Sequence, residues 1–161
     1  MSIRDIPLTT IDGETTTLAE YSDRSVLIVN VASRCGLTPQ YEQLEDLQKT
    51  YGDRGFTVLG FPSNQFRQEL DSEAEIKKYC SMTWGVTFPM FAMVKVNGKS
   101  QHPLYAELTN VEDSRGKAGK VQWNFEKFLV APDDRITRFR PRTRPDDPEV
   151  ISALEESLPH P

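Results

Sequence analysis

Cysteine is the residue type in this chain that is most able to carry covalent chemistry, and Cys35 has a favourable position. It follows an apolar run at 26–31 that is typical of a buried strand. Thr38 and Pro39 come just after it and predict a helix start, with Thr38 as the N-cap. Unpaired backbone N–H groups and the helix dipole at such a point favour a thiolate over a thiol. The sequence therefore predicts that Cys35 is a nucleophile rather than an inert core residue.

The second cysteine, Cys80, lies far along the chain, on a helix predicted over 72–83. Thr38 stands where a Cys-x-x-Cys motif would have its second cysteine, so dithiol exchange within one turn is not available. The sequence begins without the apolar segment of a secretory signal, and we therefore expect a cytoplasmic protein. In that reducing compartment a structural disulfide is disfavoured, whereas a transient, catalytic one is compatible with two cysteines.

The elements that position Cys35 alternate between strands and helices. Asp12-Gly13 predicts a tight hairpin turn near the N-terminus. Further strands are predicted at 26–31, 56–61, 90–96, 123–130 and 135–139, and helices at 38–52, 72–83, 102–109 and 147–158. The β-α-β order at the start implies parallel strands, and the last two strands imply an antiparallel edge. The pattern resembles an α/β thioredoxin-like fold, with a central mixed β-sheet flanked by helices and an N-terminal β-hairpin.

The chain of 161 residues is long enough for one domain with a core of its own, and we expect that domain to cover 1–161. Hydrophobic residues make up 37% of the chain and charged residues 27%, which is typical of a globular protein. The longest apolar runs are only a few residues, too short to span a membrane. The net charge of −5 disfavours nucleic acid as the main partner.

Three segments resemble the signature blocks of the glutathione peroxidase family. They read Asn-Val-Ala-Ser-Arg-Cys-Gly-Leu-Thr at 30–38, Leu-Gly-Phe-Pro-Ser-Asn-Gln-Phe at 59–66 and Trp-Asn-Phe-Glu-Lys-Phe-Leu-Val at 123–130. The resemblance covers nearly the whole chain and implies a non-selenium, cysteine-type, thioredoxin-dependent-like bacterial member. Such an enzyme is a thiol peroxidase that reduces hydrogen peroxide and organic hydroperoxides, lipid hydroperoxides included. The alternative is a peroxide sensor or redox relay that passes oxidation to a partner protein.

The resemblance also implies roles for individual residues. Cys35 would attack the peroxide, and its partners would be Gln65, Trp123 and Asn124, whose amide and indole N–H groups are neutral donors. Such donors can stabilise a thiolate, the peroxide oxygens and the leaving group without an adjacent base. The sulfenic acid on Cys35 would form a disulfide with Cys80, the resolving cysteine, after its helix unwinds locally. Thioredoxin or glutathione would re-reduce that disulfide, and no bound cofactor or metal is expected.

Some features depart from the family pattern. Many members have cysteine at the position of Ser63, so one rival for the resolving role is missing. The loop after Gln65 keeps the Gln68-Glu69 pair but lacks the usual glycine and proline, which leaves its conformation open. The segment 110–120 is short compared with members whose insertion there builds a tetramer, and a monomer is therefore expected.

Two further patterns leave alternatives open. The densest charge cluster consists of the arginines at 135, 138, 140, 142 and 144. We favour a solvated edge strand whose charge discourages edge-to-edge pairing, and the alternative is a patch that binds an anion or a partner. Phe88-Pro89 resembles the cis-proline position of thioredoxin-like folds, which predicts a cis peptide over a trans, purely structural turn.

Overall fold

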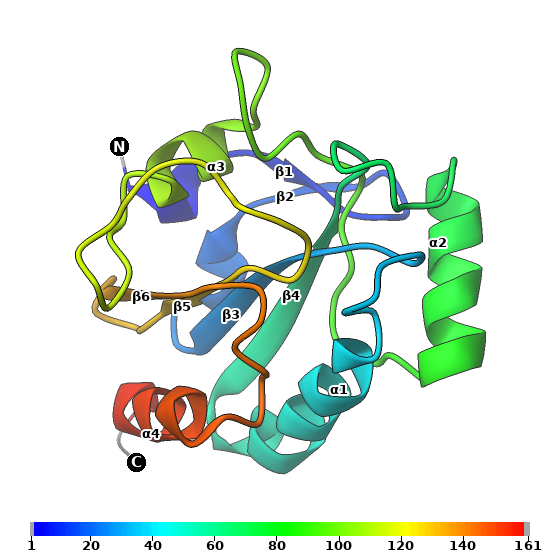
Figure 1. Cartoon of the computed structure of the whole chain (residues 1–161). Helices are drawn as coiled ribbons and strands as arrows, with labels where there is room; N and C mark the ends of the chain where they lie inside the picture. Colours follow the sequence, from blue (N-terminus) through cyan, green and yellow to red (C-terminus); the bar gives the residue numbers. More distant parts are fainter. Residues whose placement is uncertain (1, 160–161) are drawn as a thin grey trace.

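The computed structural model describes residues 2–159 and has a four-stranded sheet at its centre (Figure 1). In spatial order the strands are β4 (Phe56–Pro62), β3 (Ser25–Val31), β5 (Lys127–Val130) and β6 (Ile136–Phe139). β3 and β4 are parallel, whereas β5 is antiparallel to both of its neighbours. A separate hairpin pairs β1 (Leu8–Thr9) with β2 (Thr15–Thr16). The predicted mixed sheet and N-terminal hairpin are therefore confirmed.

Helices cover both faces of the sheet. The α-helices are α1 (Gln40–Tyr51), α2 (Glu73–Tyr79), α3 (Pro103–Leu108) and α4 (Pro148–Ser157), with short 3-10 helices at Ile3–Asp5, Leu18–Tyr21 and Gly52–Arg54 and a π-helical turn, η4, at Cys80–Trp84. Successive residues of β3 alternate between two core clusters, as the side-chain period of a strand requires. One cluster includes α1 and α4, and the other includes α3 (Figure 1). Within residues 2–159 no helix is both long and apolar enough to cross a membrane.

Three helices begin at side-chain caps that the sequence predicts or allows. Ser72, His102 and Asp147 each accept a hydrogen bond from a backbone N–H in the first turn of α2, α3 and α4. The α-helical part of the predicted helix 72–83 ends early, at Tyr79, because the chain widens there into η4. Cys80 therefore lies at the first position of a π-helical turn, a less regular element than a continuous α-helix.

The predicted strand at 90–96 is not formed as a regular strand. The segment still follows the outer edge of β4, where Phe91 N donates to Gly60 O at 2.9 Å. The next bond to β4 joins Val94 N to Pro62 O at 2.9 Å. Three steps along this segment therefore oppose two along β4, and the extra residue limits the pairing with β4 to one isolated bridge, Gly60–Met90.

Two other local predictions differ from the structure. The predicted cis peptide at Phe88-Pro89 is wrong, because no peptide bond among residues 2–159 is cis. In the trans form the carbonyl of Pro89 accepts a hydrogen bond from Gly60 N at 3.0 Å, so the turn is anchored on β4. The predicted strand 123–130 begins only at Lys127, because the chain before it turns with a φ of 67° at Phe125.

The three sequence blocks meet at one edge of the sheet (Figure 1). Parallel strands end at the same edge, so the loops after β3 and β4 leave the sheet side by side. β5 is antiparallel to β3 and therefore starts at that edge. The loops 32–39, 63–71 and 120–126 are brought together in this way, although they lie far apart in the sequence.

Candidate active site

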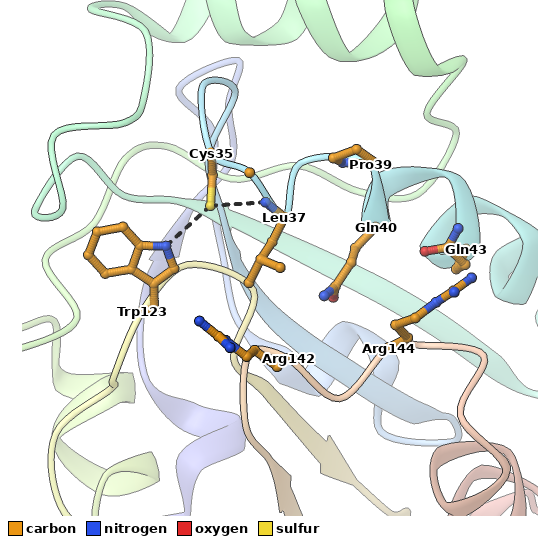
Figure 2. A pocket seen from close by; sticks show the side chains of 9 residues that line it. Cys35, Leu37, Pro39, Gln40, Gln43, Trp123, Arg142 and Arg144 are labelled. Atoms are coloured by element: carbon orange, nitrogen blue, oxygen red, sulfur yellow. Dashed lines mark hydrogen bonds between the residues drawn. The ribbon is translucent and has the colours of Figure 1, made fainter.

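The sulfur of Cys35 faces two N–H donors (Figure 2). The backbone N of Leu37 and the indole Nε1 of Trp123 each lie 3.3 Å from Sγ. Both donors point their N–H groups at the sulfur and so fix its position beside the Trp123 ring. Of the three neutral donors predicted for Cys35, only Trp123 bonds to this sulfur within residues 2–159, and the Leu37 N–H is an additional donor.

Thr38 holds the cysteine loop closed. Its Oγ1 accepts from Cys35 N and donates to Ala32 O, both at 2.9 Å. The prediction of Thr38 as N-cap is wrong, because the N-cap of α1 is Pro39 and the helix begins at Gln40. The hydroxyl instead connects the two ends of a short loop, and this fixes the backbone on both sides of the sulfur.

Asn30, near the end of β3, fixes the turn that carries Trp123. Its Nδ2 donates to Trp123 O at 3.1 Å, and its Oδ1 accepts from Glu126 N at 3.1 Å. Its own carbonyl accepts from Phe125 N, at the residue with positive φ. Asn30 is fully buried, and the bonds to the turn satisfy both ends of its amide. The sequence signal for it is the lone polar residue in the run 26–31.

We expect Asn30→Ala to lower the free energy of unfolding by about 2–4 kcal/mol, because it leaves the buried N–H of Glu126 and the partly buried carbonyl of Trp123 without this partner. Denaturant unfolding measures this. Asn110→Ala is the matched control, because Asn110 is exposed and makes one side-chain bond to Ala106 O. An equal, small loss in both variants would show that Asn30 does not support the turn.

Gln65 is the predicted site residue that the structure does not bring to Cys35. Its Oε1 accepts from the backbone N of Val96 and of Asn97, and its Nε2 donates to Asn97 O at 2.9 Å. Both ends of the amide are therefore engaged by the 96–97 turn.

Gln68 is the glutamine that lies beside the cysteine loop. Its carbonyl accepts from Arg34 N at 2.8 Å, and its Oε1 accepts from Asn124 Nδ2 at 3.1 Å. Asn124 is fully buried, and its Oδ1 has no partner within residues 2–159. The retained Gln68-Glu69 pair was the sequence signal for this placement.

Glu69 ties the same loop to the residue before Arg34. Its Oε1 accepts from Ser33 N at 3.0 Å and from Leu70 N at 2.8 Å. Burial raises the pKa of this carboxyl, although the bonds from Ser33 and Leu70 oppose the shift. The residues 33–34 and 68–69 are thus joined by backbone and side-chain bonds, and this joint positions Cys35 relative to Gln68.

A pocket of about 740 Å³ opens beside Cys35 (Figure 2). Trp123 forms part of its wall and is 38% exposed, although its ring packs on that of Phe66, with 4.9 Å between the ring centroids. Large aromatic side chains are usually buried. The exposure of this indole is therefore more typical of a surface that a ligand contacts. The other lining residues are Gly36, Leu37, Pro39, Gln40, Gln43, Arg142 and Arg144.

Cys80 is buried away from this pocket. Its thiol donates to the Tyr41 hydroxyl at 3.3 Å, and burial raises its pKa to about 11. Both cysteines are free thiols and belong to the same core cluster, but no bond joins them. The resolving role of Cys80 and the local unwinding of its helix therefore stay predictions.

The arginine cluster divides into separate groups. Arg135 is exposed and pairs with Asp133, as the favoured interpretation predicts. Arg138 instead lies buried, where its Nε donates to Glu126 at 2.7 Å, so the interpretation of a solvated edge is wrong for it. Arg140 pairs with the same carboxylate at 3.1 Å. The last two arginines of the cluster line the pocket.

Comparison with known proteins places this arrangement in a family. The family model described as Glutathione peroxidase matches residues 3–109. The chain is 50% identical to the Thioredoxin/glutathione peroxidase BtuE of Escherichia coli, over 92% of each chain. It is 43% identical to the Hydroperoxy fatty acid reductase gpx1 of Synechocystis, over 92% of this chain and 90% of the relative.

Solved structures agree with the sequence relatives. The crystal structure of T. cruzi GPX1 matches with a TM-score of 0.77 and 31% identity, over 98% of this chain and 97% of that one. A thioredoxin family protein from Chlorobium tepidum matches with a TM-score of 0.66 at 21% identity, which confirms the thioredoxin-like fold. The chain therefore belongs to the glutathione peroxidase family and is a peroxidase.

Proposed function

We propose that this peroxidase is a thiol peroxidase in which Cys35 reduces hydrogen peroxide and organic hydroperoxides. The observation that supports it most is the sulfur of Cys35, held by two N–H donors at the wall of an open pocket. The thiolate attacks one peroxide oxygen, and the O–O bond breaks. Cys35 becomes a sulfenic acid, and the other oxygen leaves as an alkoxide or hydroxide that takes a proton from water.

Neutral amides complete the site in this proposal. Trp123 and Leu37 donate to the sulfur before attack. The same N–H groups can then stabilise the negative charge that develops on the leaving oxygen. Asn124 follows Trp123 in the chain and donates to Gln68, whose carbonyl in turn accepts from Arg34 N in the cysteine loop. We therefore assign the amide role to Gln68 rather than to Gln65.

Cys80 is the proposed resolving residue. Its thiol condenses with the Cys35 sulfenic acid, which gives a Cys35–Cys80 disulfide and water. A dithiol donor then returns both cysteines to thiols and itself becomes a disulfide. The printed name of the Escherichia coli relative supports thioredoxin as that donor, with glutathione as the other candidate.

Trp123→Phe tests the role of the indole donor. The phenyl ring keeps the packing on Phe66 but removes the N–H that faces Cys35. We expect the rate constant for oxidation of pre-reduced enzyme by hydrogen peroxide to fall about tenfold to a hundredfold. Rapid quenching followed by thiol counting measures it.

Trp84→Phe is the matched control for this measurement. It also removes one indole N–H, but that N–H bonds to the Tyr79 hydroxyl at 3.0 Å, away from Cys35. Equal rate constants in Trp123→Phe and the wild type would contradict the proposed role of the indole.

A further inference from the structure

The segment 141–145 carries the last two arginines of the cluster and is fixed to the active site. Pro141 and Pro145 are buried, and each proline restricts the backbone at its position. The carbonyl of Pro141 accepts from Gln40 Nε2 at 2.9 Å and from Lys127 Nζ at 3.0 Å. Gln40 begins the helix after the cysteine loop, and Lys127 begins the strand after the Trp123 turn. The backbone that carries Arg142 and Arg144 is therefore anchored on both sides of the pocket.

Lys127 strengthens this anchor. Its ammonium is fully buried and also donates to Phe125 O at 2.6 Å, in the turn that follows Asn124. One side chain thus joins the Trp123 turn to the arginine segment. A solvated edge strand would not need such a buried connection, because exposed backbone can bond to water.

Arg142 and Arg144 bring positive charge to the pocket, and few carboxylates lie near enough to balance this charge. Arg142 has no hydrogen-bond or ion-pair partner within residues 2–159, and Arg144 bonds to Asp146 through two side chains that are mostly exposed. An exposed pair of this kind is weak and easily exchanged. None of the described residues that line the pocket is acidic. Arg138 and Arg140, by contrast, are matched with buried or partly buried carboxylates.

Apart from the two arginines, the pocket is lined mainly by apolar residues, with Gln40 and Gln43 as the polar exceptions. Leu37 lies between the sulfur and Arg142, and Trp123 and Pro39 line the pocket on either side of it (Figure 2). Arg142 lies on the Trp123 side of this pocket and Arg144 on the Gln43 side. A second cleft of about 440 Å³ adjoins it and shares Leu37, Trp123 and Arg142. The combined surface offers apolar contact beside the sulfur and positive charge at its rim.

We propose that Arg142 and Arg144 form a carboxylate-binding site that selects hydroperoxides carrying both an alkyl chain and a carboxylate. The alkyl chain lies on Leu37 and Trp123, and the carboxylate lies on the guanidinium groups, whose planar donors suit it. This inference rests on the proposed peroxidase function of Cys35. A thiol reductant with carboxylates would share the charge but not the need for apolar walls, and Cys80 already supplies the second thiol.

The test compares a hydroperoxy fatty acid with its methyl ester, both below the concentration at which they aggregate. Pre-reduced enzyme is mixed with each in a single turnover without any thiol reductant, and the rate constant of Cys35 oxidation is measured. We expect the acid-to-ester ratio of rate constants to fall about tenfold in the double variant Arg142→Gln/Arg144→Gln, since two exposed charge pairs are lost. Added salt lowers the ratio in the wild type by screening the same charges.

Arg135→Gln is the control variant, because it removes one positive charge from the same arginine cluster without touching the pocket. Its acid-to-ester ratio stays at the wild-type value. An unchanged ratio in the double variant overturns the carboxylate site while leaving the peroxidase function intact. A normal ratio with slower re-reduction by glutathione also overturns it and assigns the arginines to the thiol. Failure of wild-type enzyme to react with either hydroperoxide or with hydrogen peroxide would instead overturn the proposed function.

Discussion

Cys35→Ser is expected to lower peroxide reduction by at least about a thousandfold, the largest effect of any single change in this chain. A serine hydroxyl stays protonated at neutral pH and is a poor nucleophile towards a peroxide. It cannot form a sulfenic acid or a disulfide either. The substitution changes one atom at a buried site, so the bonds from Leu37 and Trp123 can be kept to the oxygen. The measurement is steady-state peroxide consumption with thioredoxin and its reductase.

Denaturant unfolding and the first turnover provide the controls for this prediction. Cys35→Ser should unfold at nearly the wild-type denaturant concentration, which would show that lost activity does not come from lost structure. Cys80→Ser should still consume one equivalent of peroxide per chain, because its Cys35 is intact. Substantial peroxide consumption by Cys35→Ser would assign the chemistry to another group and would contradict the proposed function.

The position of Cys35 could be predicted from sequence because it depends on local signals. An apolar run of strand length ends just before it, and the helix signals follow just after it. The β-α-β order of the chain then predicts that β3 and β4 are parallel. Their C-terminal ends therefore lie at the same edge of the sheet. These features need only periodicity and topology, and the structure confirms them.

The glutamine that completes the site could not be chosen in the same way. Gln65 and Gln68 lie three positions apart in a loop without regular structure, so no period decides which side each faces. The loop path is set by a local bond from Glu69 N to Asn64 Oδ1 and by a tertiary bond from Arg34 N to Gln68 O. Arg67 also has a φ of 58°, a left-handed conformation that arginine rarely adopts and that the sequence therefore does not predict.

One interpretation could not describe all five arginines of the cluster, for a related reason. Alternate arginines in a strand would share one face, but β6 ends at Phe139, and Pro141 prevents its continuation. Arg138, within β6, lies buried against Glu126. The segment after the strand places Arg142 and Arg144 at the pocket. Their separation depends on where the strand stops, which a pattern of charges alone does not show.

Cys80→Ser is expected to stop thioredoxin-linked turnover after the first equivalent of peroxide, with at least about a hundredfold loss in the steady-state rate. In the wild type the thiol of Cys80 is bonded to Tyr41, and its pKa of about 11 keeps it protonated at neutral pH. In the proposed mechanism it becomes a nucleophile when η4, which ends at Gly85 with a φ of 61°, leaves this packing. The variant removes the nucleophile and leaves the Cys35 sulfenic acid to accumulate, where a sulfenic-acid reagent can label it.

Ser81→Ala is the matched control, because Ser81 is exposed on the same turn and takes no part in the Tyr41 contact. Parallel assays with thioredoxin and with glutathione as the sole donor separate the remaining possibilities. Full thioredoxin-linked turnover in Cys80→Ser would contradict a Cys35–Cys80 disulfide. Turnover with glutathione alone would show that this thiol reduces the sulfenic acid directly. A wild-type protein that forms the disulfide but turns over with neither donor would favour the relay, because the oxidising equivalents of the disulfide would then have to pass to a partner protein.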